Sequence, residues 1–397
     1  MDKLAIHGGT PVRETPIAYS RQYIDDADIA AVTQALRSDF LTCGPRLPAL
    51  ERRLEAVTGA AHAVAVANGT AALHAALYAA GVGPGDEVIT TPMTFAASAN
   101  AALYLGARPV FADIDPGHWN ICPRAVERAV TPRTKAVVAV DYTGQAAPLE
   151  PLLDICRGRG LALVEDAAHS LGTRYNGQPV GSVADFTTFS FHPVKTVTCG
   201  EGGAVTVNDS APAERLRGFR AHGVTRDKAL LQGGDGAAWW YEQQDLGCNY
   251  RLTDIQAALL ISQLDKLEAF AVRRNNIVSR YRKAFAQLPQ VIPQGEVAGS
   301  ESVYHLFVLR LDLESLTAGR RQVFDALFAE NILCNVHYIP MYYHPYYQGL
   351  GYQRGLCPNA ERLYEQILSL PLYPAMTDAD VDDVILAVKK VLGHYAK

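Results

Sequence analysis

Between residues 60 and 260, short apolar runs alternate with longer stretches whose apolar residues recur at helical spacing. The short runs are typical of buried strands, and the longer stretches are typical of helices with one apolar face. Regular alternation of the two predicts a mostly parallel sheet with helices on both faces. We expect its strands near residues 63–67, 87–90, 108–111, 136–140, 161–165, 186–191 and 204–207.

The two ends of the chain follow other patterns. Residues 11–22 contain two prolines and predict an extended arm, after which an amphipathic helix begins near residue 24. Residues 255–287 form one long helical pattern, and its basic residues suit a solvated helix face. Downstream we expect strands at 303–311 and 332–337 and helices at 320–331, 361–368 and 378–392. We therefore predict a large α/β domain at residues 1–260, including the arm, and a smaller C-terminal α+β domain at residues 261–397.

Composition limits the class of protein. The 397 residues are 49% hydrophobic and carry a formal net charge of -5, which provides no basic field for nucleic acid and little attraction to an anionic membrane. No apolar run approaches the ~20 residues of a membrane span, and the first residues do not resemble a leader. The seven cysteines are odd in number and lack metal-ligand spacing, so we expect free thiols and no metal site. These features predict a cytoplasmic protein.

One lysine stands in an unusual setting. Lys195 follows the apolar run 186–191 and precedes a glycine-rich segment at 200–203. Among aromatic, small and apolar residues a lysine loses solvation, which lowers its pKa and lets the amine attack a carbonyl near neutral pH. On residue type alone, an exposed lysine in a turn is the alternative. Cys199 lies nearby in the chain and is expected to be a small packed residue.

Two further motifs favour the catalytic interpretation. Asp166 ends an apolar strand, where ligands gather in an open α/β sheet, and its carboxylate would keep a heteroaromatic nitrogen protonated. Asn68-Gly69-Thr70 joins a strand to an alanine-rich helix whose first amides suit an anion. The alternatives are a helix cap for Asp166 and an ordinary capped turn for the second motif. Lysine, aspartate and anion site together are the requirements of pyridoxal 5'-phosphate.

Five motifs resemble, in order and spacing, the sugar aminotransferases of the DegT/DnrJ/EryC1/StrS family. They lie at residues 68–70, 165–169, 190–195, 200–203 and 247–252, and the resemblance covers nearly the whole chain. It implies an aspartate-aminotransferase-like fold (fold type I) and a pyridoxal-phosphate enzyme. Within the family, residues 19–22, 39–42, 140–142 and 336–342 are most similar to the branch that acts in pseudaminic acid synthesis.

The resemblance implies roles for individual residues. Lys195 would carry the cofactor and then act as the general base, and Asp166 would hold the ring nitrogen. The other implied cofactor contacts are Asn68, Gly69, Thr70, His169, Ser190 and Asn249, of which Asn249 would reach the phosphate bound by the partner subunit; Phe95 would stack on the ring or belong to the core. The implied substrate contacts are Tyr19, Asp39, Phe40, Leu41, Thr42, His337, Tyr338, Met341, Tyr342, Tyr343 and His344.

The implied reaction moves an amino group from L-glutamate to the 4-keto position of a UDP-linked 4-keto-6-deoxy-N-acetylhexosamine, in a homodimer with shared active sites. Three alternatives stay open. The dehydratase branch of the family carries histidine at the lysine position, so Lys195 argues against it. Amination of another nucleotide-linked 3- or 4-keto sugar is compatible with the same motifs. A non-catalytic, sugar-sensing homologue would not need the lysine, the aspartate and the anion motif together.

Overall fold

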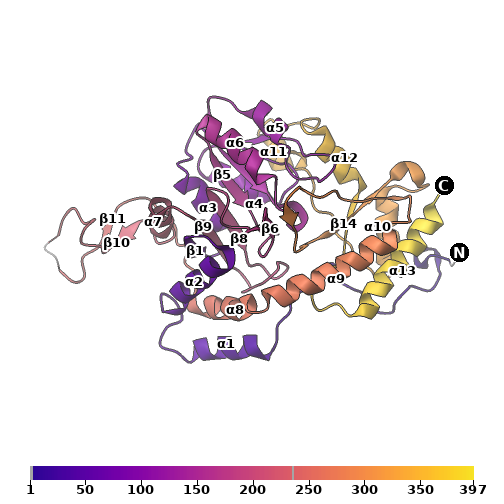
Figure 1. Cartoon of the computed structure of the whole chain (residues 1–397), viewed down its shortest axis with the longest axis horizontal. Helices are drawn as coiled ribbons and strands as arrows, with labels where there is room; N and C mark the ends of the chain where they lie inside the picture. The colour runs from indigo at the N-terminus through magenta and orange to yellow at the C-terminus, as the bar shows by residue number, and fades with distance from the viewer. Residues whose placement is uncertain (1–2, 235–236) are drawn as a thin grey trace.

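The computed structural model describes residues 3–234 and 237–397 and is built around a seven-stranded sheet (Figure 1). The strand order is β1-β9-β8-β5-β4-β2-β3, in which β9 runs antiparallel to both of its neighbours and the other pairs are parallel. This confirms the predicted mostly parallel sheet. The strands are β1 (His62–Val66), β2 (Glu87–Thr90), β3 (Arg108–Phe111), β4 (Thr134–Val140), β5 (Ala162–Asp166), β8 (Phe186–Ser190) and β9 (Gly203–Val207).

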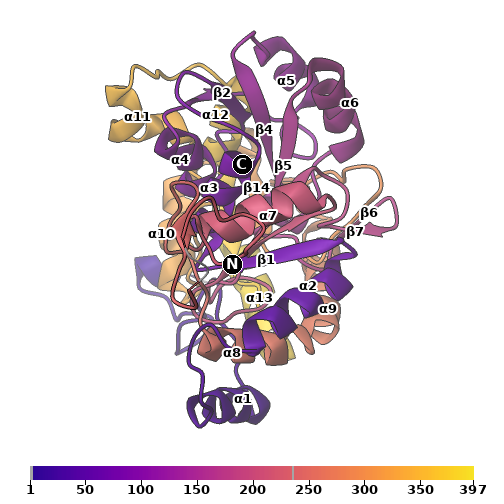
Figure 2. The ribbon, with the colours of Figure 1, turned by 90° about the vertical axis from the view of Figure 1, so that its left-hand side faces the viewer.

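Helices cover both faces of this sheet (Figure 2). Successive strand residues point to opposite faces, so neighbours such as Leu163 and Val164 of β5 enter two different apolar cores. One core contains α2 (Arg46–Thr58), α5 (Pro123–Ala129), α6 (Leu149–Arg159) and α8 (Asp254–Leu264). The other contains α3 (Gly69–Ala79), α4 (Ala96–Tyr104) and α7 (Ser210–Phe219). Outside them, α1 (Asp26–Leu36) packs against α8.

A further core lies in the C-terminal part of the chain. It is formed by a three-stranded antiparallel sheet, in the order β12-β14-β15, and by α9, α10 and α13. The elements of this part are α9 (Leu267–Phe285), β12 (Val291–Ile292), β14 (Phe307–Leu311), α10 (Arg320–Ala329), α11 (Pro345–Gly349), α12 (Pro358–Gln366), β15 (Ile367–Leu370) and α13 (Asp378–Tyr395). Mixed helices and antiparallel strands make this the smaller α+β unit of the fold.

The N-terminal arm packs on the C-terminal part, although the sequence placed it with the large domain. Leu4 and Ile17 are buried in the C-terminal core. The buried carboxylate of Glu330 accepts hydrogen bonds from the backbone N–H groups of Ala5 and Val12, at 2.9 Å each, and pairs with Lys390. A buried carboxylate needs such partners, and the arm supplies two of them.

The predicted continuous helix at 255–287 is wrong, because it breaks between α8 and α9. Lys266, at the break, turns its amine toward Asp25 and Asp28 at the start of α1. The two halves of α9 then belong to different cores: Leu267 packs with the large sheet, whereas Tyr281 packs with the C-terminal one. Helix α9 is therefore shared by both parts of the molecule, and residue 260 lies within α8.

Residues 332–337 do not form the predicted strand. In the described structure this segment takes part in two isolated bridges, from Ile332 to Ile17 and from Asn335 to Ser369, instead of a continuous strand. Residues 335–338 line a cavity, so the chain follows the cavity wall here. The predicted helix at 361–368 ends at residue 366, and the strand β15 begins directly after it.

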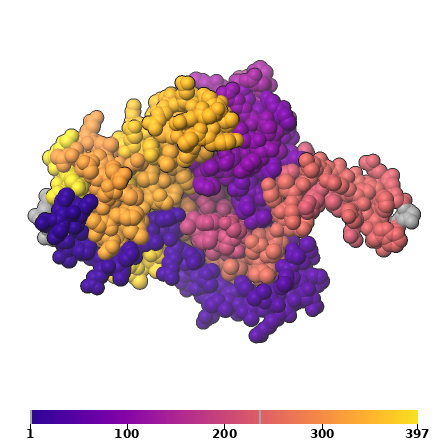
Figure 3. All heavy atoms as spheres, turned by 180° about the vertical axis from the view of Figure 1, so that it is seen from behind, coloured from indigo at the N-terminus to yellow at the C-terminus, as the bar shows by residue number. Residues whose placement is uncertain are grey.

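A small three-stranded sheet and a two-stranded ribbon complete the fold. β6 (Arg174–Tyr175), β7 (Gln178–Pro179) and β13 (Ser300–Glu301) make a small sheet, whereas β10 (Val224–Thr225) and β11 (Glu242–Gln243) make a ribbon that projects from the body (Figures 1 and 3). Trp239, Tyr241 and Leu246 near the ribbon expose more than half of their surface. In the described part of the chain, no helix combines the length and the apolar character that a membrane span requires.

Candidate active site

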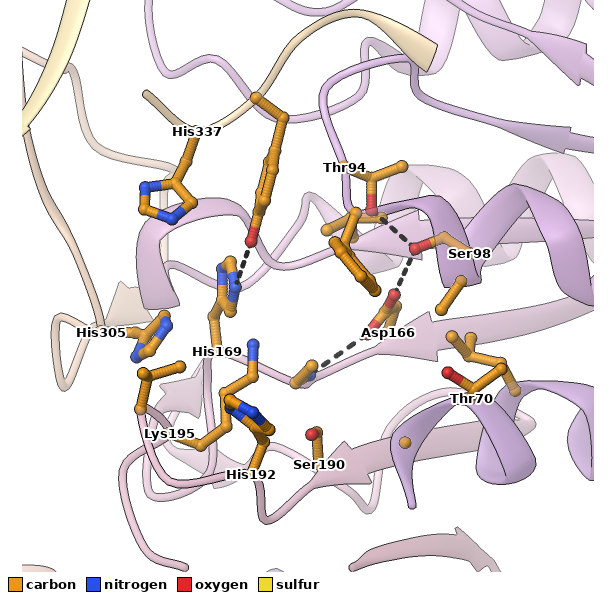
Figure 4. Close-up of a pocket in the computed structure, with 18 of the residues that line it drawn as sticks. Thr70, Thr94, Ser98, Asp166, His169, Ser190, His192, Lys195, His305 and His337 are labelled. Atoms are coloured by element: carbon orange, nitrogen blue, oxygen red, sulfur yellow. Dashed lines mark hydrogen bonds between the residues drawn. The ribbon is translucent and has the colours of Figure 1, made fainter. Parts of the chain in front are cut away.

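A cavity of about 610 Å³ opens at the carboxyl ends of β5 and β8 (Figure 4). The large sheet and α3 provide its floor, the loop after β8 provides one side, and residues 335–338 of the C-terminal part provide the opposite side. Ligands of open α/β sheets bind at this edge. The cavity is large enough for a cofactor together with part of a substrate.

Lys195 stands on the loop after β8, with its amine directed into the cavity (Figure 4). The loop turns tightly here, because the Lys195 N–H donates to the carbonyl of His192 at 2.9 Å. Burial lowers the pKa of Lys195 to about 8, and the negative charge of Asp166 opposes part of that shift. Near pH 8 a large fraction of the amine is therefore unprotonated and nucleophilic.

Asp166 ends β5 and is 5% exposed, in the same cavity. Ser98 Oγ donates to its Oδ2 at 2.6 Å, and Ser98 in turn lies 2.6 Å from the hydroxyl of Thr94. The N–H of Ala168 donates to Oδ1 at 3.3 Å. Burial raises the pKa of Asp166, while the Ser98 hydrogen bond and the charge of Lys195 lower it in part. A buried carboxylate in this state gains stability from a cationic N–H placed against it.

An anion site lies at the start of α3. Asn68 caps the helix, and its Oδ1 accepts from the N–H of Ala71 at 2.8 Å. The other amides of the first helical turn have no intrahelical carbonyl to bind and suit an anion. Gly69 approaches Ser190 so closely that a Cβ at this position would lie 2.8 Å from the Ser190 Cβ. Gly69 thus brings the helix start and the Ser190 hydroxyl to one point, with Thr70 beside them.

Neutral histidines line the wall opposite the anion site. His169 and His305 are both buried, with ring centroids 4.3 Å apart, and the Nδ1 of each has no hydrogen-bond partner in the described structure. The His169 Nε2 lies 3.0 Å from the hydroxyl of Tyr338. Burial lowers the pKa of His169 and His305 well below the usual value and lowers that of His337 to about 4. These rings therefore act through hydrogen bonding and contact rather than through charge.

A pair of buried carboxyls, Glu165 and Asp141, lies on the face of β5 opposite to Asp166. Val140 pairs with Asp166 across the strands, so Glu165 and Asp141 project to the other face. Glu165 Oε2 accepts from Thr187 at 2.8 Å, and Asp141 accepts from Ser170. Burial raises the pKa of both carboxyls, that of Glu165 to about 7, and the charge of Glu165 contributes to the shift at Asp141. One proton shared between them removes the repulsion of two buried charges.

This carboxyl pair supports the site from behind. Ser170, which donates to Asp141, follows His169 directly in the chain. Asp141 also accepts from the N–H of Ala147 at 2.8 Å, which fixes the segment after β4. These two hydrogen bonds to Asp141 hold the segment after β4 against the loop that carries His169.

The structure brings together most of the residues selected from the sequence. Eleven of them line the cavity: Tyr19, Asn68, Gly69, Thr70, Phe95, Asp166, His169, Ser190, Lys195, His337 and Tyr338. The others lie outside it: Asp39, Phe40, Leu41, Thr42, Asn249, Met341, Tyr342, Tyr343 and His344.

The residues outside the cavity differ in exposure: Tyr343 and His344 are half-buried, and the others are of two kinds. Residues 39–42 and Asn249 are exposed on the surface. Met341 and Tyr342 are enclosed instead: Met341 is in an apolar core, and the Tyr342 hydroxyl donates to Glu361 Oε1 at 2.8 Å. The resemblance implies that residues 341–344 line the substrate site of the partner subunit, and their substrate contacts stay a prediction.

Sequence reasoning missed Ser98, Thr94 and His305. Ser98 stands among alanines in a buried helix, and His305 stands between Tyr304 and Leu306, two residues before β14. A polar residue in an otherwise apolar buried element is the signal that identifies such positions, because it requires a partner.

Comparison with known proteins agrees with this geometry. Residues 22–389 match the model of the DegT/DnrJ/EryC1/StrS aminotransferase family. The chain belongs to this family. Among curated relatives, the spore coat polysaccharide biosynthesis protein SpsC of Bacillus subtilis is 43% identical over 95% of this chain and 97% of its own.

Solved structures of family members superpose over nearly the whole aminotransferase. The PLP form of Spr1654, a sugar aminotransferase of Streptococcus pneumoniae, has a TM-score of 0.88 at 32% identity and covers 96% of this chain and 99% of its own. Helicobacter pylori PseC, described as an aminotransferase of pseudaminic acid biosynthesis, has a TM-score of 0.89 at 32% identity and covers 96% of this chain and all of its own. The chain is thus a pyridoxal-phosphate-dependent sugar aminotransferase of fold type I.

The residues of the cavity fit this cofactor. The space between Gly69 and Ser190, which a Cβ at position 69 would fill, would hold the phosphate. Asp166, whose raised pKa shows that its charge is only partly stabilised, would hold the protonated ring nitrogen. The Lys195 amine would bind the aldehyde carbon. When bound, pyridoxal phosphate withdraws electrons from the carbon that carries the transferred amino group.

The shared proton predicts a pH effect on stability. Because the folded pKa of Glu165 lies above its unfolded value, its stabilising contribution is complete below about pH 4.5 and is lost as the pH rises to about 7. Glu165→Gln keeps a donor toward Asp141 at every pH. From pH 5 to pH 8, we expect the unfolding midpoint of the variant to rise by roughly 2–5 °C relative to the wild type.

Thermal unfolding followed by circular dichroism at several pH values measures this difference. Glu214→Gln serves as the matched control, since that carboxylate is on the surface and its loss removes no buried proton. If the variants Glu165→Gln and Glu214→Gln keep the same pH-independent offset from the wild type, the carboxyl pair shares no proton.

Proposed function

We propose that this aminotransferase moves the amino group of L-glutamate to the 4-keto position of a UDP-linked 4-keto-6-deoxy-N-acetylhexosamine, as in pseudaminic acid biosynthesis. The observation that carries the proposal is a Lys195 amine and an Asp166 carboxylate facing one cavity, with an anion site beside them. The full-length likeness to PseC supports the choice of sugar. SpsC, at higher identity, belongs to polysaccharide biosynthesis and favours a related nucleotide-linked keto sugar as the second candidate.

In this proposal each side chain has a limited task. Lys195 would hold the cofactor, and once the donor had displaced it, its unprotonated amine would take the α-proton from the donor and pass it to the cofactor. Asp166 would keep the ring nitrogen of the cofactor protonated, and the hydrogen bond from Ser98 fixes the direction of the Asp166 carboxylate. The Tyr338 hydroxyl, 3.0 Å from His169, fixes that ring against the cofactor.

We also propose a homodimer whose active sites are shared. Asn249 is exposed and lies outside the cavity of its own chain, near the base of the projecting ribbon. The exposed Trp239 and Tyr241 give this region the apolar surface of a protein interface. A partner seated here would receive Asn249 at its phosphate. The seven free cysteines support a reducing compartment, the cytoplasm, as the place of the reaction.

Replacing Lys195 tests the catalytic assignment. Lys195→Ala removes both the cofactor attachment and the base, so kcat should fall by at least about a thousand-fold while the fold is retained. Borohydride reduction of the wild type followed by peptide mapping should place the cofactor on the peptide that contains Lys195. Lys389→Ala, which removes an exposed lysine, should keep full activity. A reduced adduct on another lysine contradicts the assignment.

Mixing two inactive variants tests the shared site. In a heterodimer of Lys195→Ala and Asn249→Asp, one site carries both changes and the other carries neither. With half of the dimers mixed, activity should return to about a quarter of the wild-type value. Lys195→Ala mixed with Asp166→Asn is the matched control: both residues line the same cavity, so every mixed site keeps one lesion and stays inactive. Equal recovery in both mixtures, or none in either after demonstrated subunit exchange, refutes the placement of Asn249.

A panel of nucleotide-linked keto sugars tests the substrate assignment. Purified enzyme is incubated with L-glutamate and each of several UDP- and dTDP-linked 3-keto and 4-keto 6-deoxy sugars, and the aminated product is measured by mass spectrometry. We expect kcat/KM for the UDP-linked 4-keto-N-acetyl sugar to exceed the others by at least about ten-fold. A preference for a 3-keto or dTDP-linked sugar overturns the assignment but not the aminotransferase activity.

A further inference from the structure

A second cavity, of about 550 Å³, lies in the C-terminal part between α9 and the strands β12 and β14. No step of the proposed reaction uses it. Its walls are mostly apolar, and two aromatic rings, Phe285 and Phe307, stand 6.1 Å apart at one side. The remaining apolar walls are made by Val278, Val291, Ile292, Val308 and Leu309.

One cation stands at the opening of this cavity. Arg282 pairs with Glu296, with Nη1 and Oε1 at 2.8 Å, and its guanidinium lies 5.1 Å from the ring centroid of Tyr304. Both side chains of the ion pair are well exposed, at 41% and 64%. Such exposed pairs hold together weakly, so an anionic ligand can displace Glu296 from Arg282 at little cost. The guanidinium fork then offers two parallel donors to a carboxylate or sulfonate.

The wall of the second cavity continues into the active site through a single residue. Tyr304 and Leu306 line the second cavity, whereas His305 between them lines the first. The carbonyl of Thr143 accepts from the N–H groups of His305 and Leu306 at 2.8 and 3.2 Å, and the buried Arg274 donates to the carbonyl of His305 at 3.2 Å. These bonds hold the three residues as one unit, so a displacement of Tyr304 moves His305.

Tyr304 is in a conformation that can respond to such a contact. Its φ of 50° lies in the left-handed region, which is unfavourable for a residue with a side chain. The neighbouring hydrogen bonds maintain it, including one from the Tyr304 N–H to Ser302 Oγ at 3.0 Å. A ligand against the Tyr304 ring acts directly on this strained backbone.

We propose that the second cavity binds a small molecule with a flat apolar ring system and one anionic group, and that its occupancy alters the active site through Tyr304 and His305. The ring system would lie against Phe307, Val291 and Ile292, the apolar side chains of this cavity that are only partly buried, where it removes apolar surface from water. The anionic group would bind Arg282 at the opening. The volume fits a molecule of two or three fused or linked rings.

An aromatic sulfonate, 8-anilinonaphthalene-1-sulfonate, has this chemistry and reports binding through its fluorescence. Titration of the cofactor-loaded enzyme should give saturable binding. Arg282→Gln should weaken that binding at least five-fold, because the anion loses its partner. Glu296→Gln should tighten it at least two-fold, because the competing carboxylate is gone. Lys283→Gln, the adjacent exposed lysine on the same helix, is the matched control and should change it less than two-fold.

The opposite effects of Arg282→Gln and Glu296→Gln on probe affinity distinguish the proposed site from other sites on the protein. Probe bound in the first cavity, or at exposed apolar patches, does not distinguish Arg282 from Lys283. If the Arg282→Gln and Lys283→Gln variants bind the probe equally, or if Glu296→Gln weakens binding as much as Arg282→Gln, the cavity is not the site. All three side chains are on the surface, so the variants are expected to fold, which circular dichroism verifies.

The link to the active site has its own measurement. With saturating probe, KM or kcat of the wild-type transamination should change at least two-fold. In Arg282→Gln the probe concentration that gives half of this effect should rise by the same factor as the dissociation constant. Kinetics that stay unchanged while the probe is bound would overturn the link through His305.

Discussion

The site depends on a carboxylate and an amine that share one water-poor cavity. Burial disfavours the charged form of both Asp166 and Lys195, so each needs compensation from its surroundings. Ser98 and the N–H of Ala168 supply part of it to Asp166. The rest is left for the bound cofactor, and α4, the end of β5 and the loop after β8 must meet at one point to arrange it.

Much of this arrangement could be predicted from the sequence, because it depends on local patterns. The apolar runs that became β5 and β8 end at Asp166 and shortly before Lys195, and parallel neighbours bring their carboxyl ends together. Asn68 and Gly69 lie at the start of α3 for the same reason, at the end of β1. Periodicity and turn chemistry are therefore enough to place the lysine, the aspartate and the anion site at one edge.

What the sequence could not predict depends on partners far along the chain. The break before α9 requires Lys266 to reach Asp25 and Asp28, and the burial of Tyr342 requires Glu361. His305 reaches the cavity only because Thr143, on another part of the molecule, fixes its backbone. None of these pairings is visible in the local pattern of apolar and polar residues. Residues 332–337 are an example, because their pattern predicts a strand that the structure does not form.

Helix α9 has a consequence for how substrates enter and leave. Its first half is built into the core of the large sheet and its second half into the core of the C-terminal part, without an interruption between Leu267 and Phe285. A hinge rotation that parted the two halves of the molecule would have to bend this helix or strip apolar side chains from one of the cores. We therefore expect ligands to exchange through movements of loops at the rim, without a parting of the two cores.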